Sequence, residues 1–216
     1  MKTRNLYLVR HGQSIYNLEN RFTGWKDVDL TTLGKAQAKE AGKILSEVDF
    51  DYCYISNLKR AKNTLQFILK EINQSPQIEN NIALNERDYG DLIGQNKDEA
   101  AQKFGADQVQ IWRRSFDIPP PGGESLKMTA ERTLPYYRKI ILPKVLESNN
   151  IIVSAHGNSI RAIVMDIFNL TSKQILKTEI GWCEPWKISY DRVGNLSNYK
   201  IIPRPSEPSN SQLYNK

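Results

Sequence analysis

The two histidines of this 216-residue chain stand in matching surroundings. His11 and His156 each follow an apolar run, and each is followed by glycine, an amide residue and serine. A neutral imidazole is a nucleophile and an acid–base group near pH 7, and a neighbouring glycine lets the backbone approach a bound group closely. Two histidines in parallel contexts favour a shared functional site over two structural histidines bonded to nearby backbone.

Arginines accompany these histidines. Arg10 directly precedes His11, and Arg60 falls in the first turn of an expected helix. A planar guanidinium holds two phosphate oxygens at once, and a helix that opens at Ser159 would offer free amide hydrogens to an anion. These residues predict phosphoryl chemistry in which side chains supply the positive charge.

Other chemistries fit the residues less well. Zinc sites usually take three or four closely spaced ligands, whereas Cys53 and Cys183 lie in strand-like apolar runs and are expected to be reduced thiols. A serine hydrolase of the α/β type needs a Gly-x-Ser-x-Gly turn, and a P-loop needs a Gly-rich sequence that ends in Lys and Ser or Thr. The sequence contains neither motif. We therefore expect no metal.

Alternating strands and helices must position these residues. Apolar runs predict strands over 5–9, 51–55, 151–154, 185–190 and 196–202. Cap residues and apolar spacing predict helices over 31–46, 57–72 with Ser56 as cap, 129–148 with a bend at Pro135, and 159–168. Pro185 should stand at a strand start or on an edge strand. The fold class is α/β, a three-layer sandwich with a mostly parallel central sheet flanked by helices, and both histidines fall at carboxyl ends of strands, where such sheets bind ligands.

The chain is expected to form one catalytic domain over residues 1–202. Residues 81–123 are polar and predict a partly helical insertion over the active site. Residues 203–216 are rich in Pro, Ser and Asn and predict a mobile C-terminal tail.

Charge and hydropathy limit the partners. The net charge of +6 is spread without a long basic run, so a small anionic substrate explains it and no nucleic acid is expected. The apolar runs are far shorter than the ~20 residues that span a bilayer, and a secretory signal is not apparent. We expect a cytoplasmic protein without a membrane partner.

Short blocks of sequence resemble a known family. Residues 8–14 (LVRHGQS) resemble the signature of the histidine phosphatase superfamily. Other blocks, together spanning much of residues 5–180, are similar to the cofactor-dependent phosphoglycerate mutases: NRFTGW (20–25), LTxxG (30–34), SxLxRA (56–61), LNERxYG (84–90), NK (96–97), WRRS (112–115) and HGNS (156–159). The blocks NRFTGW and WRRS are the most specific to the mutases.

This resemblance implies roles for the matching residues. His11 would carry the phosphoryl group, Arg10, Arg60 and His156 would surround it, and Glu86 would act as general acid and base. The remaining matches would bind substrate: Ser14, Asn17, Thr23, Gly24, Tyr89, Lys97, Arg113, Arg114, Gly157 and Asn158. The implied reaction interconverts 3- and 2-phosphoglycerate in glycolysis and gluconeogenesis, without a metal, through phospho-His11 and with 2,3-bisphosphoglycerate as primer.

The chain also departs from the family pattern. Asp88 stands where histidine is usual, Tyr16 replaces a tryptophan, and residues 181–185 do not match the usual Pro-Thr-Gly region. The same phosphohistidine chemistry would serve a phosphatase for small phosphorylated metabolites, and a bisphosphoglycerate synthase or a non-catalytic anion-binding module remain further alternatives. Oligomeric state is open, with a homodimer or larger homo-oligomer possible.

Overall fold

A single six-stranded sheet organises the molecule in the computed structural model, which describes residues 4–147 and 149–214. The strands lie in the order β3-β2-β4-β1-β5-β6, and the first four are parallel. β5 and β6 continue the sheet in antiparallel fashion. The strands are β1 (Asn5–Arg10), β2 (Tyr52–Ile55), β3 (Gln77–Asn80), β4 (Asn150–Ala155), β5 (Trp186–Tyr190) and β6 (Leu196–Ile201). The sheet is thus mostly parallel, as the sequence predicts.

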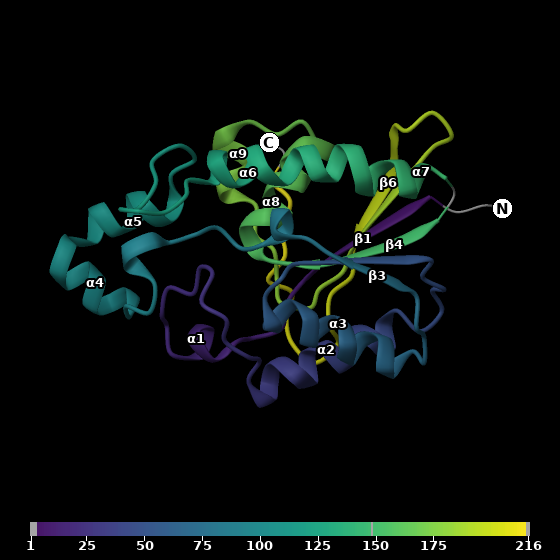
Figure 1. Cartoon of the computed structure of the whole chain (residues 1–216), viewed down its shortest axis with the longest axis horizontal. Coiled ribbons are helices and arrows are strands. Elements are labelled where there is room, and N and C mark those ends of the chain that lie inside the picture. Colours follow the sequence, from purple (N-terminus) through teal and green to yellow (C-terminus); the bar gives the residue numbers. More distant parts are fainter. Residues whose placement is uncertain (1–3, 148, 215–216) are drawn as a thin grey trace.

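Helices cover both faces of this sheet (Figure 1). One face carries α2 (Thr32–Ile44) and α3 (Lys59–Glu71). The other carries α6 (Leu126–Tyr136), the π-helical segment η3 (Tyr137–Ile141), α7 (Leu142–Leu146), α8 (Gly157–Ile167) and α9 (Ser172–Lys177).

Side-chain alternation along β1 divides the core in two. Leu6 and Leu8 pack with the α6–α8 side, whereas Tyr7 and Val9 pack with α2 and α3. Successive residues of a strand point to opposite faces, so a strand buried on both faces must be apolar throughout. This pattern confirms the expected three-layer α/β sandwich.

The predicted insertion lies beyond the carboxyl ends of the strands, at the left of Figure 1. Its elements are η1 (Ile82–Leu84), η2 (Gly90–Leu92), α4 (Lys97–Phe104) and α5 (Ala106–Arg114), and the short helix α1 (Ile15–Leu18) lies nearby. Phe22, Leu92, Ala100 and Val109 form a small core of their own. This separate core gives the insertion the packing that its polar sequence does not suggest.

Several boundaries differ from the sequence prediction. Strand β3 was not predicted because all four of its residues are exposed, as befits an edge strand without an apolar pattern. The predicted helix over 129–148 begins earlier, at Leu126, because Ser125 caps it, and it passes through Pro135 before its π-helical segment. α7 ends at Leu146, and residue 148 lies outside the described residues. α9 was also missed.

The predicted cap of the third helix is wrong as well. Leu58, not Ser56, is the N-cap of α3, and it makes no side-chain cap bond. The hydroxyl of Ser56 instead lies 2.7 Å from Nε2 of His156 and accepts the backbone N–H of Leu58. Ser56 thus contacts a histidine of the site, and α3 begins at Lys59, two residues later than predicted.

Residues 203–214 lie against the domain. Arg204 is 2% exposed and pairs with Glu40 and Glu207, and its Nε donates to the carbonyl of Trp182. The expected mobility of the tail stays a prediction, and residues 215 and 216 lie outside the described residues. Within the described ranges, none of the helices has the length and apolarity needed to cross a membrane. Both Cys53 and Cys183 are buried free thiols.

Candidate active site

The parallel pairing of β1 with β4 brings the two histidines together. Arg10 is in register with Ala155, so the next residues, His11 and His156, leave the sheet side by side. The backbone N–H of His11 donates to the carbonyl of Ala155 at 3.0 Å, and the two imidazole centroids are 5.0 Å apart. The sheet edge therefore forms one site from residues 145 positions apart in the chain.

His11 is buried and oriented by its own loop. Its Nδ1 lies 2.7 Å from the carbonyl oxygen of Gly12, which only accepts, so Nδ1 carries the hydrogen and Nε2 keeps its lone pair. Burial, followed by the charges of Arg60 and Arg10, holds the pKa of His11 well below its ordinary value. A Cβ on Gly12 would lie 2.3 Å from the carbonyl oxygen of Gly34, so only glycine fits this turn. His11 is thus a neutral imidazole at physiological pH, with the lone pair on Nε2.

Two arginines flank His11 with part of each guanidinium anchored. Arg10 donates through Nη1 to the carbonyl of Ile180 at 2.7 Å and packs over the ring of Trp182. Arg60 donates through its Nη atoms to the carbonyls of Gly24 (2.8 Å) and Lys26 (3.0 Å), and burial lowers its pKa to about 10. These hydrogen bonds hold both guanidinium groups in place beside His11.

Three buried nitrogens around His11 have no partner among the described residues. They are Nε of Arg10, Nε of Arg60 and Nδ1 of His156. His156 is fully buried, its Nε2 being taken by Ser56, and burial also lowers its pKa well below the ordinary value. Unsatisfied buried polar groups are rare and costly, so this cluster is suited to an anion that supplies acceptors.

Glu86 projects into the same space from the loop after η1. Its Oε1 accepts from the backbone N–H of Arg87 (2.8 Å) and from both the backbone N–H (3.1 Å) and side-chain amide (3.0 Å) of Asn158 at the start of α8. Its side chain is 9% exposed. Oε1 is therefore held by three hydrogen bonds, and the position of the Glu86 carboxyl group is fixed. A carboxyl group held in this way is suited to proton transfer.

These side chains line a cavity of about 170 Å³. Seventeen residues line it, of which seven are Arg or Lys and two are Glu. A volume below the ~300–1,000 Å³ typical of drug-sized ligands suits a small metabolite. Burial, followed by the charges of Arg113 and Arg10, lowers the pKa of Lys97 to about 8. The cavity is built for a small, strongly anionic ligand.

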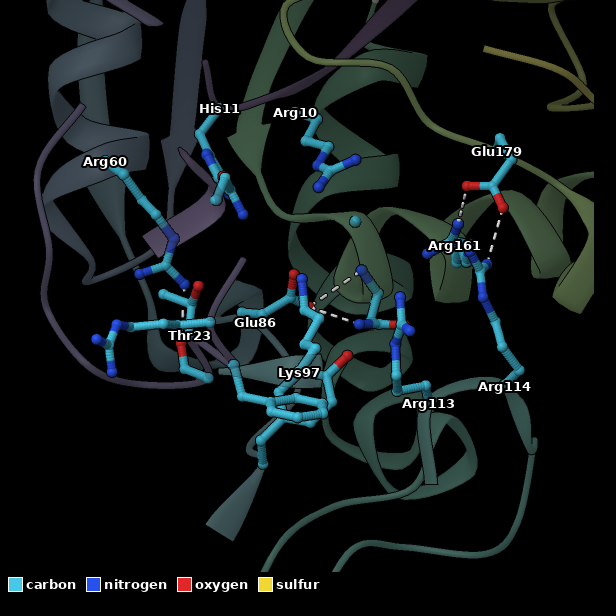
Figure 2. Close-up of a pocket in the computed structure, with 17 residues that line it drawn as sticks. Arg10, His11, Thr23, Arg60, Glu86, Lys97, Arg113, Arg114, Arg161 and Glu179 are labelled. Carbon is cyan, nitrogen blue, oxygen red and sulfur yellow. Dashed lines mark hydrogen bonds and ion pairs between the residues drawn. The ribbon is translucent and has the colours of Figure 1, made fainter. Parts of the chain in front are cut away.

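Figure 2 shows two regions in this cavity. His11, Arg10 and Arg60 lie at one end, and Glu86 stands between them and Lys97. Lys97 of α4 and Arg113 of α5 face Glu86 from the other side, with Arg114 further along. His11, Arg10 and Arg60 thus share one cavity with the cations Lys97, Arg113 and Arg114. Glu86 lies between the two groups.

Most of the predicted site residues line the cavity. They are Arg10, His11, Asn17, Thr23, Gly24, Arg60, Glu86, Tyr89, Lys97, Arg113, Arg114, Gly157 and Asn158. His156 and Ser14 do not line the cavity. Ser14 is fully buried as the N-cap of α1, where its hydroxyl contacts the lining residue Asn17.

Sequence reasoning missed four lining residues: Arg21, Phe22, Arg161 and Glu179. Arg21 and Phe22 stand inside the NRFTGW block, and Arg161 lies in α8 two residues after the HGNS block. Their positions in or beside these blocks could have identified them, whereas no sequence block marks Glu179.

Asp88, which stands where the family usually has histidine, does not line the cavity. Its carboxylate accepts the backbone N–H of Gly90, and its own N–H donates to Glu124. The described residues contain no group of three or more His, Cys, Asp or Glu placed to hold a metal ion.

Comparison with known proteins agrees with this geometry. The model of the histidine phosphatase superfamily (branch 1) matches residues 6–198. The chain belongs to this superfamily. Within it, the chain belongs with the 2,3-bisphosphoglycerate-dependent phosphoglycerate mutases, since it is 56% identical to the one from Afipia carboxidovorans over 183 residues, covering 83% of this chain and 88% of the relative. The one from Parvibaculum lavamentivorans is 51% identical over 200 residues, covering 91% and 95%.

A solved superfamily structure shares the fold. The α-ribazole phosphatase from Shigella flexneri superposes with a TM-score of 0.81 at 21% identity, covering 95% of this chain and 100% of that one. At this identity the likeness concerns the fold alone.

Proposed function

We propose that this protein is a 2,3-bisphosphoglycerate-dependent phosphoglycerate mutase, an isomerase that interconverts 3- and 2-phosphoglycerate in glycolysis and gluconeogenesis. The observation that carries the proposal is the cluster of three unpartnered buried nitrogens beside a neutral histidine, two of which are guanidinium donors. A phosphoryl group in transfer spreads negative charge over three oxygens, and fixed positive donors are the main source of its stabilisation. The sequence similarity to mutases over most of the chain supports the same conclusion.

The site residues account for both transfers. Phospho-His11 gives its group to a substrate hydroxyl: the N–P bond breaks, an O–P bond forms, and Glu86 takes the hydroxyl proton. In the second transfer Nε2 of His11 attacks the other phosphoryl group of the bound molecule. The O–P bond breaks, and Glu86 returns the proton to the leaving oxygen. Arg10, Arg60 and His156 hold the group throughout.

The far end of the cavity is proposed to retain the rest of the ligand. Lys97, Arg113 and Arg114 supply positive charge there, and Asn17, Thr23 and Tyr89 supply polar contacts. When bound, 2,3-bisphosphoglycerate supplies the phosphoryl group that charges His11. The seven lining cations and the unpartnered Nε donors of Arg10 and Arg60 fit a molecule of that charge.

A phosphatase on the same scaffold is the second candidate. It would pass the phosphoryl group of His11 to water, and solved phosphatases share this fold. The second set of cations on the insertion favours the mutase, because an enzyme that releases its product after one transfer has no need to hold two anions. A non-catalytic anion-binding module would not need His11 or Glu86, yet both line the cavity. Nothing in the site therefore favours such a module over an enzyme.

The deciding experiment measures interconversion of 3- and 2-phosphoglycerate in EDTA, with and without a trace of 2,3-bisphosphoglycerate. A mutase shows fast isomerisation that the trace bisphosphate stimulates and that EDTA leaves intact. Release of inorganic phosphate with little isomerisation would establish the phosphatase instead. Loss of activity in EDTA that manganese restores would refute the metal-independent mechanism.

A His11→Asn variant tests the phosphoryl carrier. We expect a folded protein without isomerase activity and without acid-labile phosphate after exposure to 2,3-bisphosphoglycerate. Acid-labile phosphate retained by the variant would place the carrier elsewhere. A cytoplasmic location and a homo-oligomeric state are further expectations, to be checked by fractionation and by light scattering.

A further inference from the structure

Glu179 is an acidic residue within the cationic half of the cavity. It follows α9 and points toward the insertion, where its carboxylate engages two arginines at once (Figure 2). Oε1 lies 2.8 Å from Nη1 of Arg114, and Oε2 lies 2.6 Å from Nη2 of Arg161. Its side chain is 41% exposed. The proposed transfers assign no role to this carboxylate.

The backbone on both sides holds Glu179 in place. Its N–H and carbonyl form a reciprocal pair of 2.9 Å hydrogen bonds with Gln212 of the C-terminal segment. The carbonyl of the preceding residue, Thr178, accepts from Nε of Arg161 at 2.9 Å. The position of the carboxylate is therefore set by the fold and not only by its ionic partners.

The charge around Glu179 is strongly positive. Arg161 approaches Gly157 at the start of α8. Burial lowers the pKa of Arg10, and the charges of Glu86 and Glu179 oppose that shift. Apart from Glu86, Glu179 is the one carboxylate among the lining residues that the structure describes, against seven cations. It neutralises part of the field that an incoming anion meets, and it occupies donors of Arg114 and Arg161 that a phosphate would otherwise take.

We propose that Glu179 is a specificity-determining residue, a fixed counter-charge that weakens the binding of a bisphosphorylated ligand more than that of a monophosphorylated one. The inference rests on the proposed function. Repulsion from a fixed carboxylate grows with the charge of the ligand, so the molecule with two phosphates is penalised most. Glu179 thereby prevents the cavity from holding a bisphosphate too tightly to turn it over and release it.

The test compares Glu179 with an isosteric neutral amide. In a His11→Asn background, which cannot accept the phosphoryl group, calorimetry measures the dissociation constants of 2,3-bisphosphoglycerate and 3-phosphoglycerate with and without Glu179→Gln. We expect bisphosphate to bind on the order of threefold to tenfold more tightly in the amide variant, with a smaller gain for 3-phosphoglycerate, because a half-exposed charge is partly screened. The gain should shrink as salt is raised.

Two controls isolate the charge at this position. Glu179→Asp keeps the carboxylate and should retain the original ratio of the two dissociation constants. Asp166→Asn removes a carboxylate that pairs with Arg138 outside the cavity, and it should change neither constant.

The outcomes separate this inference from the proposed function. The inference is wrong if Glu179→Gln leaves the ratio of the two dissociation constants unchanged, weakens bisphosphate binding, or gives the same constants as Glu179→Asp. Glu179 would then merely orient Arg114. If the unmodified enzyme fails to isomerise phosphoglycerates, the proposed function fails whatever the ratio shows.

Discussion

Nδ1 of His11 lies 2.7 Å from the carbonyl oxygen of Gly12, the next residue in the chain. A carbonyl accepts but never donates, so this contact alone fixes which ring nitrogen is protonated. The ring of the proposed nucleophile is thus oriented by a backbone carbonyl of its own loop. Burial and two neighbouring arginines then keep the ring neutral.

The neutral state of the buried histidines predicts how stability depends on pH. His11 and His156 have folded pKa values well below 6.5, so between those values and 6.5 the unfolded chain binds more protons than the folded protein. Stability then rises with pH across this window, by up to about 1.4 kcal/mol per pH unit for each histidine. Urea unfolding between pH 5 and 7 in phosphate-free buffer measures this slope.

A single-histidine variant provides the control for this slope. His11→Asn should lower the slope of unfolding free energy against pH by about the contribution of one histidine. Above pH 7 the slope should be the same in both proteins. If the slope does not change when His11 is replaced, carboxylates and not His11 cause the loss of stability at acidic pH.

Replacing Glu86 tests proton transfer. Glu86→Gln keeps the size of the side chain, and the amide oxygen can still accept from Asn158, but the proton exchange is lost. We expect kcat to fall by about 10²- to 10⁴-fold with a small change in KM, as for a general acid–base residue. Glu99→Gln, an exposed substitution on α4, should have no effect. If Glu86→Gln retains more than a tenth of the activity, another group transfers the proton.

Lys97 predicts an alkaline limit to substrate binding. Its pKa is lowered to about 8, chiefly by burial and by repulsion from Arg113 and Arg10, so its charge is present below about pH 8 and lost above it. The KM for 3-phosphoglycerate should therefore rise as the pH passes 8. Lys97→Arg stays charged and should flatten the rise. An equal rise in both proteins would exclude Lys97 as its cause.

The sequence indicated that His11, Arg60 and His156 would lie together because their proximity follows from topology. His11 and His156 directly follow parallel strands, and Arg60 lies in the first turn of the helix after β2. The motifs then indicated which insertion residues line the same cavity. Their roles toward a ligand stay predictions, as for Ser14, because a motif does not show whether a residue touches a ligand or a neighbour.

What the sequence could not predict depends on contacts between distant segments. Glu179 enters the cavity because α9 and the C-terminal segment meet, and no local pattern encodes that meeting. The partner of His11 is adjacent in the chain, but a backbone carbonyl leaves no mark in a sequence either. Strand β3, exposed throughout, gave no periodic signal.

The departure at residues 181–185 predicts a stability effect. Glu184 is fully buried, and its carboxylate accepts from Ser209 Oγ (2.8 Å) and the backbone N–H groups of Asn210 (3.0 Å) and Ser211 (2.9 Å). Glu184→Ala removes the acceptor of the Ser209 hydroxyl and of the Asn210 N–H, and leaves the Ser211 N–H with Ser209 Oγ alone. We therefore expect a loss of about 2–4 kcal/mol in unfolding free energy, and a smaller loss for Glu184→Gln. Glu131→Ala, an exposed change on α6, should stay within about 0.5 kcal/mol. Urea unfolding measures these free energies, and a Glu184→Ala variant as stable as Glu131→Ala would show that the hydrogen bonds of Glu184 contribute nothing to stability.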